Sequence, residues 1–271
     1  MKRLLWVFFC FLLLTSCSIL EEIDKTKDWS QKKLFMEATY ELKDGLYEKA
    51  INYYEKLEAR YPFGKYVHQA QLNVAYAYYR SDQTKEALAA ADRFIKFHPD
   101  HPALAYVYYL RGLINQKNSQ GLFNRFIPTD NSQRDIGATK DSYKDFAIVT
   151  SKYPDSEYAA DARKRMLYLR NNLARHEVHV ARFYIKRGAY IAAANRASYV
   201  IENYQRTPSV RDALNIMIEA YTKLGMDDLA KDTRRVLALN QENNALIEDP
   251  LKIGNDSLGE NIWNFFGLDE N

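Results

Sequence analysis

Cysteine, glycine and proline are all scarce in this chain, and each shortage narrows what the fold can be. Of 271 residues only 2 are cysteine, 10 are glycine and 7 are proline. Long β-architectures ordinarily need more turn-forming residues, so this composition favours helices. The formal net charge of +3 is too small to indicate a nucleic-acid partner. With 47% hydrophobic residues, the chain nevertheless has ample material for a core.

The N-terminal segment has the layout of an export signal. Two basic residues precede the apolar run Leu4–Leu14, which is too short to span a membrane, since spanning takes roughly 20 apolar residues. The small residues before Cys17 resemble the lipobox of bacterial lipoproteins. We therefore expect residues 1–16 to be removed as a signal peptide and Cys17 to be acylated. Ordinary secretory cleavage that leaves a free thiol is the alternative.

Lipidation would leave the mature chain without a disulfide, because Cys10 is removed with the signal and no second thiol remains. Ser18 stands where lipoproteins of the inner membrane often carry aspartate, which favours a lipid anchor on the periplasmic side of the outer membrane. Residues 17–30 are polar and lack periodicity, so we expect a tether between the lipid and the folded domain.

From Ser30 onward the sequence has a helical pattern that repeats. Pro62 and Pro99 lie 37 residues apart, and Ala50 and Ala87 keep the same spacing. Self-similarity of this length predicts a solenoid of paired helices, in which proline ends the second helix of a pair. The residues resemble the tetratricopeptide repeat, with small and aromatic residues in the first helix and alanine in the second. We expect an all-α fold, a tetratricopeptide-repeat solenoid of about five helix pairs.

The repeats divide the chain into two halves. Residues 31–155 are expected to form an N-terminal half with repeats 1–3, and residues 156–242 a C-terminal half with repeats 4–5. The third repeat is split by an insertion at 116–137, and an additional basic helix is expected around 157–173. A tail, 243–271, follows the last repeat.

The insertion and the tail both carry apolar side chains that no repeat accounts for. In either place these residues suit a short docking motif. For the tail, folding back as a cap on the last repeat is an equally good interpretation. The residues concerned are Phe123, Phe126 and Ile127 in the insertion and Trp263, Phe265 and Phe266 in the tail.

No motif of a familiar enzyme class occurs in the chain, such as a phosphate-binding loop, a nucleophile elbow or a Cys-x-x-Cys pair. The one enzyme-like string is His176-Glu177-Val178-His179, whose second histidine falls at i+3, whereas a zinc protease needs i+4. A metal-dependent hydrolase centred on His176 and His179 is the alternative. We expect no catalytic residue, no metal and no cofactor.

The predicted binding surface is the face lined by the first helix of each pair. In the tetratricopeptide family this face uses fixed positions, and in repeats 1–3 those positions are mostly aromatic. Tyrosine offers a large contact area and a polar tip, so such a groove suits an extended peptide with bulky side chains. The alternative is that some of these tyrosines pack between helices. The expected groove residues are Phe35, Leu72, Tyr76, Tyr79, Arg80, Tyr106, Tyr109 and Leu113.

One joint between helices has an excess of aromatic residues. The string "RYPFGKY" surrounds the helix-ending Pro62 with Tyr61, Phe63 and Tyr66, whereas the later joints have polar residues in place of Phe63. A spacer alone does not need this excess. We therefore add Tyr61, Phe63 and Tyr66 to the predicted groove.

Together the lipobox, the repeats and several specific strings resemble the BamD family, also called ComL or YfiO. Its members are lipoproteins of the machinery that assembles outer-membrane β-barrels. The resemblance runs to about residue 242 and is carried by "RYPFGKY", "DRFIKFHPDHP", "YLRGL", "YPDSEYAADARKR" and "RGAYIAAANR".

This resemblance implies an outer-membrane protein assembly factor that acts as a periplasmic scaffold. Its N-terminal repeats would receive the C-terminal signal of unfolded β-barrel precursors. Its C-terminal repeats would dock to a periplasmic domain of BamA, where Arg196 matches an arginine of the family. The charged positions Arg182 and Lys186 suit the same polar partner. BamC and BamE are further expected partners. A pilotin-type lipoprotein for pilus or secretin assembly, which also carries such repeats, is the alternative function.

Overall fold

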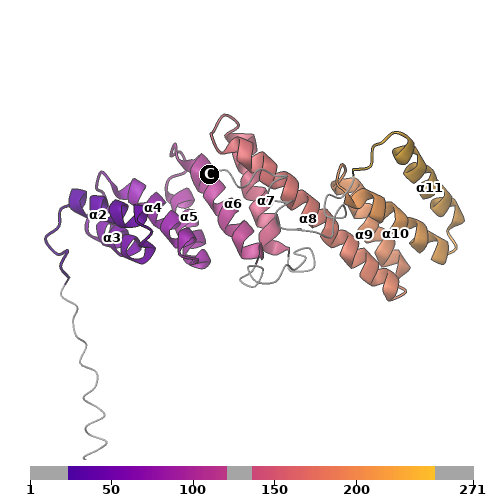
Figure 1. Cartoon of the computed structure of the whole chain (residues 1–271), viewed down its shortest axis with the longest axis horizontal. Coiled ribbons are helices and arrows are strands. Elements are labelled where there is room, and N and C mark those ends of the chain that lie inside the picture. Colours follow the sequence, from indigo (N-terminus) through magenta and orange to yellow (C-terminus); the bar gives the residue numbers. More distant parts are fainter. Residues whose placement is uncertain (1–23, 121–135, 248–271) are drawn as a thin grey trace, which may run out of the picture.

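The computed structural model describes residues 24–120 and 136–247. The predicted signal peptide and Cys17 lie outside these residues, as do the aromatic side chains singled out in the insertion and the tail. Within them, the chain forms ten α-helices and no strand, which confirms the all-α prediction. The helices follow one another in chain order along an elongated molecule (Figure 1). Their bounds are α2 (Gln31–Lys43), α3 (Tyr47–Arg60), α4 (Val67–Arg80), α5 (Thr84–Phe97), α6 (Leu104–Gln120), α7 (Gly137–Lys152), α8 (Ala159–Lys186), α9 (Tyr190–Asn203), α10 (Ser209–Lys223) and α11 (Asp227–Glu242).

The helices pack as five consecutive pairs, which confirms the predicted solenoid. In each pair a first helix lies against the helix that follows it, from α2 with α3 to α10 with α11. First helices also contact each other across neighbouring pairs, as α4 does with α6 and α8 with α10. Alanines occupy many of the fully buried positions, because small side chains let the helix axes approach closely.

Four of the five pairs share the same tight turn between their helices. In three of them a glycine adopts the left-handed backbone conformation: Gly45 with φ 78°, Gly188 with φ 71° and Gly225 with φ 71°. In the second pair Asp82 takes this position with φ 65°. Aspartate is one of the few side chains that tolerate the left-handed region, which explains how repeat 2 keeps the turn without a glycine.

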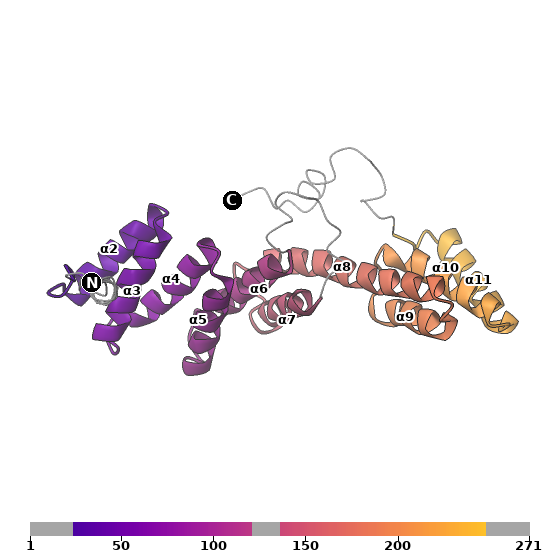
Figure 2. The same cartoon turned by 90° about the horizontal axis from the view of Figure 1, so that it is seen from below.

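The long helix α8 differs from the prediction of a separate helix around 157–173. It runs without interruption for 28 residues, about 42 Å at 1.5 Å per residue, along the long axis of the molecule (Figure 2). Ala162 and Leu169 in its first half pack in a core with α7. Ala174 and Val178 in its second half pack in the core of α9 and α10. The helix thus serves two cores, and its second half is the first helix of repeat 4.

A buried ion pair holds α6 to α7 on either side of the insertion. Asp145 is only 3% exposed, and its Oδ1 accepts hydrogen bonds from Arg111 Nε at 3.0 Å and Nη2 at 2.5 Å. Asn115 donates to Oδ2 at 3.0 Å, and Arg111 Nη1 also donates to Asp92 on α5 at 2.6 Å. Arg111 therefore ties three helices together. Removing one member of such a pair is costly, since it leaves the other charge buried without compensation.

The close approach of α6 and α7 at Gly112 yields a test of the packing. A Cβ at this position would lie 2.7 to 2.9 Å from the ring of Phe146. We predict that Gly112→Ala lowers the free energy of unfolding by about 1–3 kcal/mol through overpacking, although alanine ordinarily favours a helix over glycine by about 1 kcal/mol. Urea denaturation measures the change.

The matched control is Gly188→Ala, because nothing lies within 4 Å of a Cβ built there and only its positive φ opposes the substitution. We expect this control to cost roughly 1 kcal/mol. A Gly112→Ala protein as stable as the wild type would contradict the packing account.

Candidate binding surfaces

Tyrosines of α4, α6 and the residue preceding α8 form a contiguous set that we call the tyrosine row. Tyr76 and Tyr79 lie with ring centroids 6.5 Å apart, and both pack with Tyr106 against the same core. Tyr158 links the two α6 tyrosines, since its ring lies 5.6 Å from that of Tyr106 and stacks on that of Tyr109 at 5.1 Å. The row consists of Tyr76, Tyr79, Tyr106, Tyr109 and Tyr158.

A polar clamp fixes one end of the tyrosine row. The hydroxyl of Tyr109 donates to Asp161 Oδ2 at 2.6 Å, and Arg165 Nε donates to the same oxygen. Arg165 Nη1 also donates to the side-chain oxygen of Gln116 at 3.0 Å, which joins α6 to α8. Desolvation, aided by the hydrogen bond to Asp161, raises the pKa of Tyr109 to about 12. The Tyr109 hydroxyl is therefore neutral and already engaged.

Positive charges border the other end of the row. The Arg80 guanidinium lies 5.1 Å from the ring centroid of Tyr47 and donates to the Tyr76 hydroxyl at 2.7 Å. Lys117 Nζ lies 4.8 Å from the ring centroid of Tyr79 and donates to its backbone carbonyl at 3.0 Å. Desolvation raises the pKa of Tyr79, so this hydroxyl stays protonated. Neutral phenols bordered by cations suit a ligand with aromatic side chains and carbonyl or carboxylate oxygens.

The two leucines of the predicted groove belong to the protein's own packing. Leu72 is 6% exposed and packs with Phe94 and Leu104 in a core cluster, so its assignment to the groove is wrong. Leu113 is half-buried and packs against the cluster around Phe146. Helix positions assigned from a repeat template fail here because the side-chain direction depends on how far each pair is rotated against the next.

Sequence reasoning missed Tyr158, Asp161 and Arg165, which it left in an additional helix outside the repeats. One feature of the sequence could have indicated Tyr158. Tyr66 and Tyr158 both stand four residues after the proline that follows the preceding helix. Tyr66 stacks on Phe35 of the previous first helix at 4.8 Å, the arrangement in which Tyr158 stacks on Tyr109. The spacing from the proline therefore predicts a ring that covers the first helix of the previous pair.

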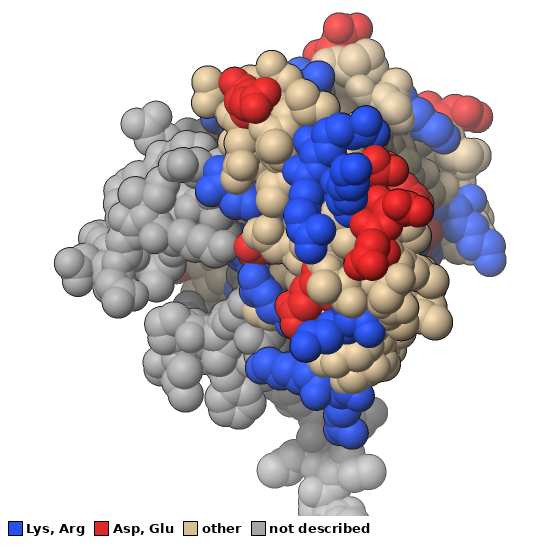
Figure 3. All heavy atoms as spheres, turned by 90° about the vertical axis from the view of Figure 1, so that its right-hand side faces the viewer, with Lys and Arg blue, Asp and Glu red and all other residues tan. Residues whose placement is uncertain are grey.

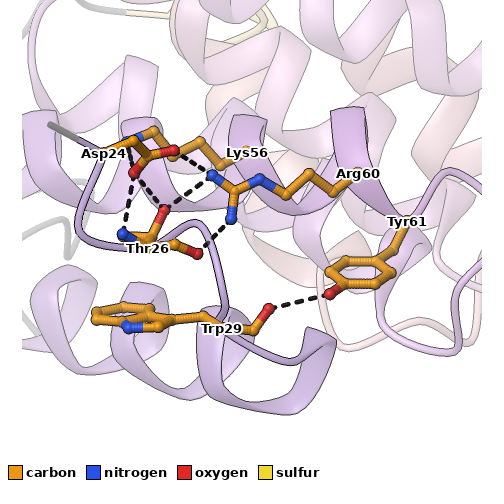
Figure 4. A network of polar contacts seen from close by, with 6 residues as sticks. All are labelled: Asp24, Thr26, Trp29, Lys56, Arg60 and Tyr61. Atoms are coloured by element: carbon orange, nitrogen blue, oxygen red, sulfur yellow. Dashed lines mark hydrogen bonds and ion pairs between the residues drawn. The ribbon is translucent and has the colours of Figure 1, made fainter.

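The three aromatic residues of the "RYPFGKY" joint have separate surroundings. The hydroxyl of Tyr61 donates to the backbone carbonyl of Trp29 at 3.0 Å (Figure 4), and Tyr66 is stacked on Phe35. Phe63 is 100% exposed. The joint thus places two of its rings in structural contacts and presents only Phe63 in full to the surroundings.

The predicted tether is shorter than expected, because residues 24–30 dock on α3. The carboxylate of Asp24 accepts a hydrogen bond from Lys56 Nζ at 3.0 Å and pairs with Arg60 (Figure 4). Arg60 also donates to the backbone carbonyl of Thr26, whose side chain is buried. Hydrogen bonds from Thr26 and Lys56 hold the pKa of Asp24 well below its usual range. The docking of residues 24–30 depends on tertiary contacts, which the polar composition of the segment does not reveal.

Lysine and arginine side chains gather in a band across the C-terminal end of the solenoid, with acidic residues beside them (Figure 3). Arg182 pairs with Asp212 of α10 at 2.9 Å, and Lys186 lies one turn further along α8. Arg196 instead projects from α9 to Glu177, which is only 3% exposed, at 3.1 Å. Glu177 and Arg182 stand five residues apart, about 140° around the helix. Arg196 therefore lies on a different face from Arg182 and Lys186.

The histidines of the enzyme-like string offer no metal site. His176 and His179 are half-buried on α8, and both already interact with neighbouring groups. Among residues 24–120 and 136–247, no group of three or more potential ligands is arranged to hold a metal ion. The same part of the chain contains no helix with the length and apolarity needed to cross a bilayer.

A comparison with protein families identifies the relatives of this solenoid. The model of the YfiO family, described as outer membrane lipoprotein, matches residues 27–237. The chain belongs to the YfiO family. The sequence resemblance is thereby confirmed, and so is an association with the outer membrane.

Named relatives of the YfiO chain extend over most of its length. It is 45% identical over 244 residues to "Outer membrane protein assembly factor BamD" of Neisseria meningitidis serogroup A / serotype 4A, covering 89% of this chain and 91% of the relative. Proteins of the same name are 38% identical over 232 residues in Xylella fastidiosa strain Temecula1 (85% and 78% covered) and 36% identical over 228 residues in Vibrio cholerae serotype O1 (84% and 94% covered).

The strings that carry the YfiO resemblance coincide with the structural contacts described above. "YLRGL" contains Tyr109, Arg111 and the close-packed Gly112, while "YPDSEYAADARKR" contains Tyr158 and Arg165. These strings meet at the junction of α6, α7 and α8, where the tyrosine row ends in its polar clamp. Two of the strings that carry the resemblance therefore build this junction.

The clamp gives a direct test. We predict that Tyr109→Phe lowers the free energy of unfolding by about 1.5–3 kcal/mol, because the charged Asp161 loses a donor. Tyr106→Phe is the control, since the described residues offer its hydroxyl no hydrogen bond, and we expect it to be within about 0.5 kcal/mol of wild type. Urea denaturation of both variants measures the difference. Equal stability of the two variants would show that the clamp contributes nothing to the free energy of unfolding.

Proposed function

We propose that this chain is an outer membrane protein assembly factor that takes part in assembling and inserting β-barrel proteins into the outer membrane. It acts as a binding scaffold and not as an enzyme. Family membership and the names of relatives at 36–45% identity support this role. The observation in the molecule itself that carries the proposal is the tyrosine row, a set of neutral phenols bordered by cations on an all-helical solenoid.

The tyrosine row is the proposed receptor for the C-terminal signal of unfolded barrel precursors. Side chains on one face of an extended strand repeat about every 6.6 Å, since each residue advances about 3.3 Å. The ring centroids of neighbouring tyrosines in the row lie 5.1 to 6.5 Å apart, a comparable spacing. Membrane-facing strands of β-barrels carry aromatic residues at their ends, so such a strand can place ring against ring. The exposed guanidinium of Arg80 is positioned to meet its backbone carbonyls or terminal carboxylate, whereas Lys117 is already paired with Asp82 at 2.5 Å.

The C-terminal half is the proposed docking site for a periplasmic domain of BamA. Arg182 and Lys186, one turn apart near the end of α8, form its centre, and their positive charges favour an acidic partner surface. The role proposed for Arg196 is different, because it neutralises Glu177 and can influence docking through the packing of α8 on α9. BamC and BamE are proposed as further partners. Acylated Cys17 is proposed to hold the scaffold on the periplasmic side of the outer membrane.

The receptor role is tested with a peptide. We predict that a fluorescent peptide ending in an aromatic strand signal binds the mature protein, and that Tyr76→Ala combined with Arg80→Ala weakens binding at least tenfold, about 1.4 kcal/mol. Fluorescence anisotropy gives the two dissociation constants. Phe97→Ala removes an aromatic side chain that is 66% exposed outside the row and serves as the control. Unchanged affinity in the double variant would rule out the tyrosine row as the receptor.

The docking role is tested at Arg196. We predict that Arg196→Ala lowers the free energy of unfolding by about 3 kcal/mol, because the buried Glu177 is left unpaired, and that BamA binding weakens with it. The double variant Arg196→Ala, Glu177→Gln removes that buried charge, so both quantities should recover. Arg182→Gln with Lys186→Glu should instead weaken binding at least tenfold with little loss of stability, because a glutamine side chain at position 182 can still donate to Asp212. Calorimetric titration with the BamA periplasmic domain measures binding. Full BamA affinity in the Arg182, Lys186 variant would contradict this docking site.

A further inference from the structure

The N-terminal end of the solenoid combines a fully exposed aromatic ring with five exposed lysines, of which Lys33 lies 4.5 Å from the ring centroid of Trp29. We propose that this end lies on the surface of the phospholipid bilayer, with Phe63 inserted at the interface and the lysines on lipid phosphates. The inference builds on the proposed lipid anchor at Cys17. It assigns to the first repeat a second, non-covalent contact with the membrane and fixes the orientation of the solenoid.

The docked turn keeps this end close to the anchor. Because Asp24 is tied to Lys56 and Arg60, residues 24–30 belong to the folded unit and no longer extend the tether (Figure 4). Only residues 18–23 separate Cys17 from that unit. At no more than about 3.6 Å per residue, this segment spans roughly 20–25 Å, compared with about 50 Å for the tether predicted from the sequence. Asp24 and the docked turn must therefore stay within that distance of the acylated Cys17.

Phe63 protrudes from a loop that is pinned to the same docked turn. On one side of it, Tyr61 donates to the carbonyl of Trp29. On the other side, Gly64 lies so close to Gln31, at the start of α2, that a Cβ on Gly64 would overlap its side chain. The loop is thus held in place while the Phe63 ring is left 100% exposed. Aromatic side chains are the residues that favour the boundary between headgroups and acyl chains.

The excess of positive charge at this end favours an anionic lipid surface as its partner. Asp28 is an exposed acidic residue in the docked turn, whereas Asp24 is already paired with Lys56 and Arg60. The lysines outnumber it, and each cation near an anionic leaflet adds to the attraction. The exposed lysines at this end, in the docked turn, the first turn of α2 and the Phe63 loop, are Lys25, Lys27, Lys32, Lys33 and Lys65.

Spin labelling tests the orientation on the whole mature protein. Cys17 is acylated in this proposal and no other cysteine remains after removal of the signal, so Phe63→Cys and Phe97→Cys each give one label. The acylated proteins are reconstituted in vesicles of phosphatidylethanolamine and phosphatidylglycerol. We expect the label at 63 to collide several-fold more often with oxygen, and several-fold less often with a water-soluble nickel chelate, than the label at 97. Equal accessibility of the two labels would overturn the proposal.

Two further measurements separate this proposal from the functional one. Flotation of the acylated wild-type protein with the vesicles tests the anchor itself, and its failure would remove the basis of both. In the non-acylated Cys17→Ser protein, we expect salt-sensitive binding to the same vesicles that falls about tenfold in Phe63→Ala and in the variant with Lys25, Lys27, Lys32 and Lys33 changed to Gln. If Phe63→Ala leaves vesicle binding unchanged and abolishes binding of the strand-signal peptide, Phe63 belongs to the precursor surface and the membrane contact is wrong.

Discussion

The uninterrupted helix α8 is the constraint on which the arrangement of this molecule depends. Its first half shares a core with α7 and its second half shares a core with α9 and α10, so one rigid rod belongs to both halves of the solenoid. A helix without glycine or proline in its interior has no natural hinge. The distance and rotation between the tyrosine row at its start and the basic surface at its end are therefore set by helix geometry. The two proposed binding sites on the scaffold can keep a fixed distance and orientation in this way.

The tyrosines show how one residue type can take part in packing and, in the proposed receptor, also offer a binding surface. In the N-terminal half the rings lie against the helix core, while the hydroxyls of Tyr76 and Tyr109 bond to Arg80 and Asp161. Such amphipathic side chains bury an apolar body and keep a polar tip accessible. The tyrosine row is consequently rigid before any ligand arrives, which lowers the entropy lost on binding a flexible chain. The same rigidity means that a substitution in the row changes stability as well as affinity.

Buried carboxylates explain why a positive charge alone does not identify the docking surface of this solenoid. Asp145 and Glu177 are both nearly inaccessible, and each is neutralised by an arginine that reaches from a neighbouring helix. Arg111 and Arg196 therefore stabilise the fold, although both lie in strings that carry the family resemblance. Arg182 and Lys186 differ from them, since they lie one turn apart on α8 and the partner of Arg182, Asp212, is only half-buried. The docking surface is better sought among such residues than among the arginines that compensate a buried charge.

The sequence by itself determined the helical class, the pairing of helices and the family, because these depend on local periodicity, on prolines that end helices and on short specific strings. It also predicted a groove that includes tyrosines of α4 and α6, and three of them, Tyr76, Tyr79 and Tyr106, pack against one core. Tertiary structure decided what no local pattern contains: the fusion of an expected separate helix into α8, the burial of Leu72, the docking of residues 24–30 and the addition of Tyr158 and Arg165 to the surface. Each of these depends on how helices rotate against one another and on which distant charge finds which partner. These contacts join residues far apart in the chain, and only the folded arrangement brings them within reach.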